Sequence, residues 1–228
     1  MSVPSDGKIL EMVACGELKI TPFLKENVQP ASIDLTLDEK ITVLKEGISV
    51  RTGEEITPEN YTESSTNNFE LAPGQMVLGQ IIETIGIPNN YIACVHNRSS
   101  LARLGLSVAL PSFINPGYSG KLPIIIKNGG NFRVKLVSGM RICQLVLHEV
   151  VPPPLADYSE RKGVKYQNEK DKQVSKLHLD HEFDEYFKKH NSKNVEKISI
   201  FINQHAKKKA ANHISSLSQD QKASLGIG

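Results

Sequence analysis

Hydrophobic residues in this chain occur in short runs over most of its length. Between Leu18 and about Val151, apolar or alternating segments such as ASIDLTL, MVLGQII, YIACV and RICQLVL are separated by clusters of Pro, Gly and Asn. Alternation with a period of two, interrupted by turn residues, is typical of β-strands. No helical pattern lies between these segments, which disfavours βαβ units and favours an antiparallel barrel or sandwich. The sequence therefore predicts a mainly β body.

A short helix is predicted before this body, within residues 5–18. Ser5 is a candidate N-cap, and Ile9, Met12 and Val13 recur at helical spacing. One apolar face of this helix is expected to pack on the strands.

The chain changes character again after the last predicted strand. The segment from about residue 152 has three consecutive prolines and dense charge, a composition that predicts an extended arm. From residue 178 onward the pattern becomes helical, and four apolar residues fall near one face: Val195, Ile198, Ile202 and Ile214. We expect one domain over residues 1–177, including the arm, and a helical extension over 178–228.

Composition and charge exclude several classes of protein. The 228 residues carry a formal net charge of +2, so neither nucleic acid nor a membrane surface is an expected partner. No apolar run approaches the roughly 18 residues of a membrane span, and a cytoplasmic location is expected. The three cysteines are far apart, and neither H-x-E nor P-C-x-x-C occurs, so no zinc site is expected.

The segment RSSLAR, which follows the predicted strand YIACV, carries groups suited to phosphate. Arg98 and Arg103 supply guanidinium groups, and Ser99 and Ser100 supply hydroxyl groups. Guanidinium groups bind phosphate oxygens in a bidentate manner, and hydroxyls add hydrogen-bond donors. Taken alone, the segment is weak evidence, because a polar turn with a surface salt bridge explains it more often than a phosphate site does; the neighbouring segments of the sequence change this.

Six segments occur in the order of one known family: ENVQPASIDLTL, LAPGQMVLGQIIETIGIPNNY, RSSLARLGL, INPGYSG, SGMRICQLVL and DYSERKGVKYQ. Together they resemble the dCTP deaminase family, whose fold and shared sites are those of the homotrimeric dUTPases. The resemblance implies a distorted antiparallel β-barrel of the dUTPase-like, or β-clip, type. It further implies a homotrimer that binds dCTP or dUTP, with Mg2+ carried by the triphosphate. If the protein is active, the resemblance implies a hydrolase, either a dCTP deaminase that forms dUTP or a dUTP pyrophosphatase that forms dUMP.

The resemblance also assigns roles to individual residues. Ser99 and Arg103 occupy catalytic positions, and Arg103 lies close to the reacting base. The positions implied in nucleotide binding are Arg98, Ser99, Ser100, Asn115, Tyr118, Gln144, Tyr158, Arg161 and Lys165.

Three positions depart from the family pattern. Where a deaminase has its catalytic glutamate this chain has Ile125, and where a dUTPase has its aspartate it has Asn115. Neither side chain can act as a general base. Glu169 stands where a glutamine is expected, and it is a candidate replacement for the missing acid. Three functions therefore remain open: an active enzyme, a nucleotide-sensing protein without turnover, and a trimeric scaffold that acts through its helical extension.

Overall fold

The computed structural model describes residues 2–50, 52–109, 112–170, 174–183, 204–205, 207–208 and 212. Two compact units are distinguished: residues 1–49 with 56–174, and residues 50–55 with 175–228. The first unit contains every strand of the described chain.

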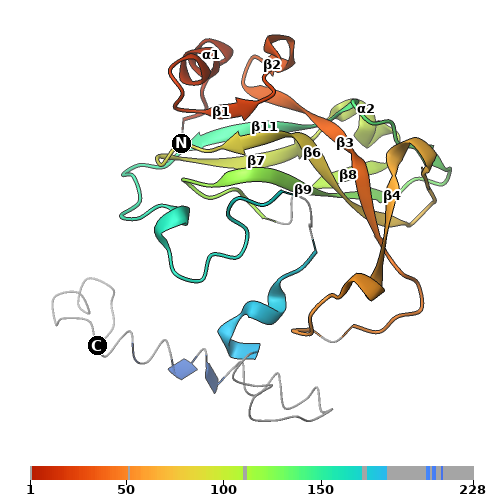
Figure 1. The fold of residues 1–228 in the computed structure, drawn as a ribbon. Helices are drawn as coiled ribbons and strands as arrows, with labels where there is room; N and C mark the ends of the chain where they lie inside the picture. Colours follow the sequence, from red (N-terminus) through yellow and green to blue (C-terminus); the bar gives the residue numbers. More distant parts are fainter. Residues whose placement is uncertain are drawn as a thin grey trace. The chain divides into compact units, whose positions relative to one another are not determined.

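The first unit is mainly β, which confirms the predicted fold class (Figure 1). Its strands are β1 (Lys19–Thr21), β2 (Val28–Gln29), β3 (Ser32–Leu44), β4 (Tyr61–Ser65), β5 (Glu70–Leu71), β6 (Met76–Gly86), β7 (Tyr91–Asn97), β8 (Leu106–Ala109), β9 (Ser119–Asn128), β10 (Val134–Lys135) and β11 (Arg141–Glu149). Its helices are α1 (Asp6–Ala14), α2 (Ser99–Arg103) and the 3-10 turns η1 (Lys25–Asn27), η2 (Pro58–Asn60), η3 (Thr66–Asn68) and η4 (Tyr158–Glu160).

The strands form a nearly closed antiparallel barrel. The main sheet has the order β7-β11-β3-β6-β9-β8, with β1 added to β6 and with β2 and β4 added to β3. The two edge strands of this sheet, β7 and β8, contact each other. Ile114, in the segment that follows β8, exchanges two backbone hydrogen bonds with Ala93 of β7, at 3.0 and 2.7 Å. All pairings between the named strands are antiparallel, so the architecture expected from the lack of intervening helices is confirmed.

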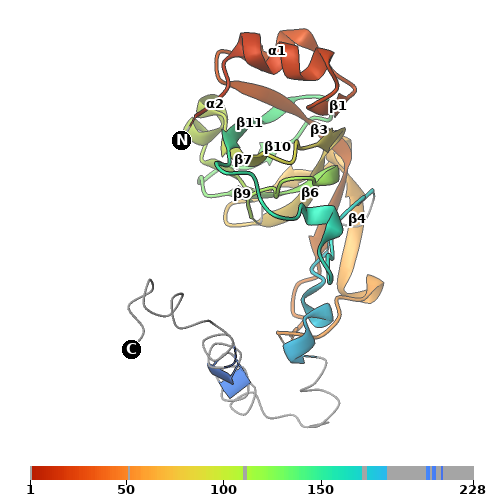
Figure 2. The same ribbon diagram turned by 90° about the vertical axis from the view of Figure 1, so that its left-hand side faces the viewer.

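Helix α1 covers part of the barrel, next to β1 and β2 (Figure 2). Ile9 and Met12 are buried in the same apolar cluster as the barrel side chains, while Val13 is partly buried against it, as their helical spacing predicts. Ser5 occupies the N-cap position but makes no capping hydrogen bond through its side chain. Packing of one apolar face therefore positions this short helix.

One strand lies in a polar, turn-rich part of the sequence, within TPENYTESSTNN. Residues 61–65 form β4, which pairs with β3 from Lys40↔Ser65 to Leu44↔Tyr61. The segment YTESS has no alternation of apolar and polar residues, so a pattern of hydrophobicity cannot reveal it. The 13-residue β3 supplies the edge on which it forms.

The second unit includes η5 (Leu177–Leu179) and the loop of residues 50–55. Phe183 is 4% exposed, and its ring lies where a side chain on Gly53 would project. In the predicted C-terminal helix, residues 204–205, 207–208 and 212 are helical. Val195, Ile198, Ile202 and Ile214 lie outside the described residues. Among the helices of the described chain, none combines the length and the apolar character that a membrane crossing requires.

Three strands are tied together by one acid on the barrel. The carboxylate of Asp38 on β3 accepts hydrogen bonds from Lys121 Nζ on β9 and from Gln80 Nε2 on β6, each at 2.7 Å. Burial acts to raise the pKa of Asp38, but the hydrogen bonds from Lys121 and Gln80 outweigh it and hold this pKa below its ordinary value. A carboxyl group whose pKa is lowered in the folded state stabilises the fold above its ordinary pKa and loses this contribution as the pH falls.

We predict that Asp38→Asn destabilises the protein by up to about 1 kcal/mol near neutral pH, because a partly exposed ion pair is lost. The difference from the wild type should narrow below about pH 4, where the wild-type carboxyl is also protonated. Urea unfolding at about pH 6 and about pH 3 measures this difference. Lys121→Met, which removes the partner, should show the same narrowing; a difference independent of pH would contradict the assignment.

Candidate functional site

The predicted phosphate segment is a short helix directly after β7. Arg98 is the N-cap residue of α2, Ser99 and Ser100 form its first positions, and Arg103 is its last residue. Ser99, Ser100 and Arg103 are exposed, whereas Arg98 is partly buried. The segment therefore presents two hydroxyl groups and one guanidinium group to solvent, with a second guanidinium group held against the barrel.

A buried carboxylate holds Arg98 in place. The side chain of Asp34 on β3 is 2% exposed. Its oxygens accept hydrogen bonds from Arg141 Nη1 at 3.0 Å and from Gln144 Nε2 at 3.1 Å, and they lie 3.7 Å from Arg98 Nε. Arg98 Nη1 also donates to the backbone oxygen of Arg141 at 2.9 Å. Charge-assisted bonds of this kind compensate the cost of burying Asp34 and fix the donors around it.

The structure thus brings Gln144 to the same end of the barrel as α2, and it adds Asp34 and Arg141, which the sequence reasoning did not single out. An acid within the otherwise apolar strand segment SIDL is the signal that could have found Asp34, since a buried charge needs partners. The position of Arg141 follows from the pairing of β11 with β3, where Arg141 lies opposite Thr36.

A second group of predicted residues lies on the turn INPGYSG. Asn115 is partly buried, and its carbonyl accepts the backbone N–H of Tyr118 at 3.2 Å. Tyr118 is 6% exposed, and its hydroxyl donates to the backbone oxygen of Lys121 at 2.8 Å. Burial raises the pKa of Tyr118, and the charges of Glu169 and Tyr158 raise it further. Its hydroxyl therefore remains a hydrogen-bond donor throughout the physiological range.

The arm folds back over this turn in the same chain. The N–H of Tyr158 donates to the oxygen of Pro116 at 2.8 Å, and the ring centroids of Tyr158 and Tyr118 are 6.1 Å apart. Gln167 accepts from the N–H of Ser119 at 3.2 Å and donates to the oxygen of Gly117 at 3.1 Å. The arm is therefore attached to the turn at both of its ends.

The last contact of the arm is a short parallel pairing with the start of β9. The N–H of Asn168 donates to the oxygen of Ser119 at 2.7 Å, and the N–H of Lys121 donates to the oxygen of Glu169 at 3.0 Å. Between these bonds, Gly120 and Glu169 form a parallel bridge. A Cβ atom on Gly120, whose φ is 149°, would lie 2.9 Å from the nitrogen of Glu169. The pairing therefore depends on glycine at this position.

The two remaining arm residues lie between these attachments. Arg161 is exposed, and Lys165 is partly buried with its ammonium 5.8 Å from the centre of the Tyr166 ring. The structure thus brings Tyr158, Arg161 and Lys165 onto the arm that covers the Tyr118 turn.

The two substituted positions carry side chains that do not transfer protons. Ile125 sits in the middle of β9, opposite Leu78 of β6 and Ala109 of β8. Asn115 offers an amide at the turn. Neither an alkyl group nor an amide takes up a proton near neutral pH, so proton transfer at this site would require another residue.

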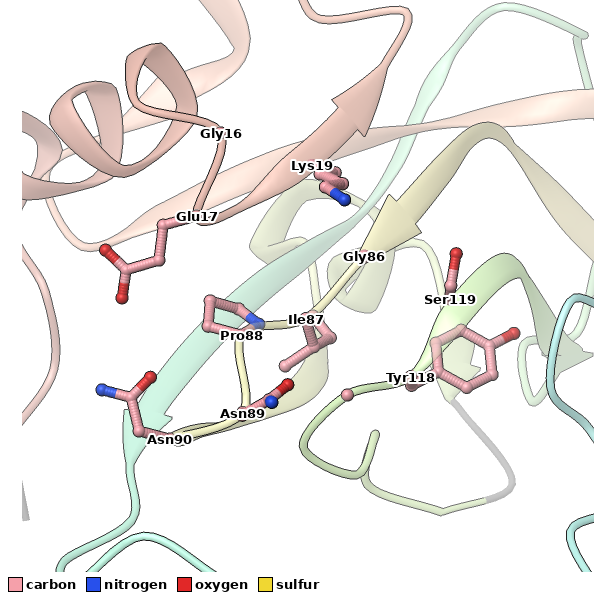
Figure 3. Close-up of a pocket in the computed structure, with 11 residues that line it drawn as sticks. Gly16, Glu17, Lys19, Gly86, Ile87, Pro88, Asn89, Asn90, Tyr118 and Ser119 are labelled. Atoms are coloured by element: carbon pink, nitrogen blue, oxygen red, sulfur yellow. The ribbon is translucent and has the colours of Figure 1, made fainter. Parts of the chain in front are cut away.

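A cavity of about 350 Å3 opens beside the turn (Figure 3). Glu17 and Asn90 lie on one side of it, and Tyr118 and Ser119 lie on the other. None of the α2 residues lines this cavity. The cavity is therefore a feature of the turn end alone.

The two groups lie at opposite ends of the barrel. Ser119 begins β9 beside Gly86, whereas Asn128 ends β9 beside Leu106, which closely follows α2. A strand rises about 3.4 Å per residue, so the 10 residues of β9 separate the two ends by about 30 Å. Within one chain the two groups therefore lie toward opposite ends of β9.

The class of protein follows first from the fold. The crystal structure of 2'-deoxycytidine 5'-triphosphate deaminase from Agrobacterium tumefaciens aligns with a TM-score of 0.53 and 24% sequence identity, over 64% of this chain and 48% of that one. The shared part is thus about half of that structure. The likeness shows that this chain has the barrel fold found in a deoxynucleotide deaminase.

Sequence similarity then identifies the family. A family model described as dCTP deaminase-like matches residues 3–150. The dCTP deaminase of Halorubrum lacusprofundi is 34% identical over 190 residues, covering 78% of this chain and 93% of that protein. The "dCTP deaminase, dUMP-forming" of Dictyoglomus thermophilum is 34% identical over 184 residues, covering 77% of this chain and 95% of that protein. This chain belongs to the dCTP deaminase-like family.

We predict that Gly120→Ala releases the arm from the turn and costs about 1–3 kcal/mol, because the new methyl group collides with the backbone of Glu169. Hydrogen exchange should lose protection at the amides of Asn168 and Lys121, whose bonds join the two segments. Gly163→Ala is the matched control: Gly163 also has a positive φ, but no atom lies near its Cβ position. Unchanged protection in Gly120→Ala would contradict the docked arrangement.

Proposed function

We propose that this protein binds a pyrimidine deoxynucleoside triphosphate, dCTP or dUTP, in sites shared between the subunits of a homotrimer. The proposal rests on membership of a family whose relatives are named dCTP deaminase and "dCTP deaminase, dUMP-forming". It also rests on the residues gathered around α2.

The arrangement around α2 is the observation that carries the proposal. Arg98, Arg103 and Arg141 bring three positive charges to this end of the barrel, and Asp34 brings one negative charge. Glu83, a buried glutamate that accepts the N–H of Thr36 beside this cluster, adds a second negative charge. The three guanidinium groups still leave an excess of one positive charge near two exposed hydroxyl groups. Fixed guanidinium groups and hydroxyl donors are the groups that recognise the oxygens of a phosphate chain. A triphosphate is the ligand that this chemistry fits best.

Magnesium would be held through the nucleotide. Among the described residues no cluster of three or more His, Cys, Asp or Glu side chains could form a metal cage. The oxygens of Asp34 are already occupied by Arg98, Arg141 and Gln144. Mg2+ commonly binds through substrate phosphates and keeps several of its waters, so these residues fit a metal that arrives with the triphosphate.

The separation of the two groups supports a shared site. Because the α2 group and the Tyr118 turn lie about 30 Å apart along β9, a site that uses both must combine two copies of the chain. A cyclic trimer supplies such a head-to-tail contact three times with the same geometry. Each site would then take the phosphate group of residues from one subunit and the turn with its arm from a neighbour.

Whether the bound nucleotide is turned over is a separate matter from whether it binds. The presence of Asn115 and Ile125 favours a nucleotide-sensing protein as the second candidate function, because these two positions carry no acid. Such a protein would respond to dCTP or dUTP through binding alone.

Binding is tested by thermal unfolding with Mg2+ and each deoxynucleotide. A ligand at 100 times its Kd stabilises the folded state by about 2.7 kcal/mol, and we expect dCTP or dUTP to raise the melting temperature. Arg98→Ala should abolish this rise, because it removes a charge-assisted phosphate contact. Arg133→Ala, at an exposed arginine outside the cluster, should leave it unchanged. A wild-type protein that shows no rise with any deoxynucleotide would contradict the proposal.

The shared site is tested by mixing two variants, each of which lacks one half of the proposed nucleotide site. Arg98→Ala disables the α2 group, and Lys165→Ala disables the arm; each alone should bind little nucleotide. After dissociation and reassembly in equal amounts, about one quarter of the sites should combine two intact halves and bind again. A site built within one chain would give no recovery. Light scattering of the unmixed proteins, which should give the mass of a trimer, checks the assembly.

A further inference from the structure

The segment that follows the arm is anchored to a loop far from it in the sequence. Phe183 is 4% exposed, and its ring lies against Gly53, in the excursion of residues 45–60 between β3 and β4. Gly53 is buried, although Thr52 and Glu54 on either side of it are exposed. A phenyl ring that packs on the backbone of a glycine is removed from water. This contact of Phe183 with Gly53 is the clasp, and both of its residues belong to the second unit.

Glycine is required on the loop side of the clasp. The φ of Gly53 is 89°, and a Cβ atom at this position would lie 2.7 Å from Phe183 Cγ. Another residue would be strained by this backbone conformation and would also displace the ring. Gly47, in the same excursion, has a positive φ of 73°, but no atom of the described chain lies within 4 Å of its Cβ position. The two glycines therefore separate the contact with the ring from the conformation of the loop.

The excursion is itself closed at its base. The N–H of Lys45 donates to the oxygen of Asn60 at 3.0 Å, and Thr57 and Asn60 form a capping box at η2. The excursion leaves β3 after Leu44 and returns to the barrel at Tyr61, which begins β4. A segment that packs on this loop is thus attached to a part of the chain whose two ends continue into paired strands.

A short stretch of chain separates the clasp from the arm. The last contact of the arm with the barrel is the bridge at Glu169, and residues 170–182 lead from there to Phe183. Within this stretch the turn η5 is closed by a bond from the N–H of Leu179 to the oxygen of Lys176 at 3.1 Å. A short tether raises the effective concentration of one contact once the other has formed. The clasp and the docked arm therefore stabilise each other through the chain that joins them.

We propose that the clasp holds the arm closed on the Tyr118 turn by making it a segment that is fixed at both ends. When such an arm opens, its far end stays attached to the excursion, so the arm gains little conformational freedom and closes again readily. An arm without the clasp is a free tail and opens more often. For a bound nucleotide the inference rests on the proposed function: a ligand under the arm leaves more slowly while the clasp is formed.

The test is hydrogen exchange, resolved by residue and measured without nucleotide. Phe183→Ala removes the ring of the clasp. Exchange of the amides of Asn168 and Lys121, whose bonds hold the arm on β9, should then become about 5–150-fold faster, the range typical of coupled sites. Leu179→Ala is the matched control, because Leu179 lies in the same unit but is 58% exposed. It should leave exchange at the wild-type rate.

A second pair of variants leaves Phe183 unchanged and decides the question even where Phe183→Ala fails to fold. Gly53→Ala should accelerate exchange of the same two amides, because its methyl group excludes the ring, whereas Gly47→Ala should not. Coupling of this kind is reciprocal. Gly120→Ala, which frees the arm at the turn, should therefore also accelerate exchange of the Phe183 amide, whose N–H donates to the oxygen of Asp180 at 2.8 Å.

The outcomes separate this inference from the proposed function. Unchanged exchange at Asn168 and Lys121 in Gly53→Ala would overturn the role of the clasp, and so would an equal acceleration in either control variant. Dissociation of labelled dCTP should be faster in Gly53→Ala by a similar factor; dissociation at the wild-type rate would overturn the effect of the clasp on the nucleotide. A protein that binds no dCTP but shows the faster exchange would contradict the proposed function and support the clasp.

Discussion

The length of an extended strand is the constraint on which the arrangement of this protein depends. Each residue of β9 advances the chain by about 3.4 Å, and the strand runs from the Tyr118 turn at one end of the barrel to the neighbourhood of α2 at the other. Residues at the two ends, which the proposed nucleotide site would combine, are thereby kept apart within a chain. Assembly of several chains is the simplest means by which a rigid barrel of this kind can bring them together.

The two ends are organised by different interactions. At the α2 end, the buried carboxylate of Asp34 attracts two guanidinium groups and an amide from neighbouring segments, so electrostatic attraction sets the positions of the donors. At the turn end, backbone hydrogen bonds and the absence of a side chain on Gly120 allow the arm to pair with β9. The first arrangement suits the binding of an anion. The second arrangement holds the arm, including Tyr158 and Gln167, against the Tyr118 turn.

The two positions at which the family's acids are replaced lie in different parts of the barrel: Asn115 is on the turn, and Ile125 is on β9. Ile125 lies in the strand pairing of β9 with β6 and β8 and is partly buried, whereas its neighbours Ile124 and Ile126 belong to the core. Glu169 lies on the arm, and its backbone pairs with the start of β9.

The sequence by itself determined the class of structure and the family. Short alternating runs indicated the antiparallel strands, the spacing of Ile9 and Met12 indicated α1, and the ordered segments from ENVQPASIDLTL to DYSERKGVKYQ indicated the family that the comparisons show. Such signals are local, because periodicity and the order of segments depend only on the succession of residues in the sequence.

Tertiary structure alone decided the contacts between distant segments. The strand β4 has no hydrophobic alternation and forms only because β3 offers an edge. Asp34 meets Arg141 across 107 positions of sequence, and the arm returns to Gly120 through backbone hydrogen bonds between residues 48 or more positions apart. Pairing of this kind depends on the register of strands and on the path of the chain in space, and residue types along a segment do not specify either.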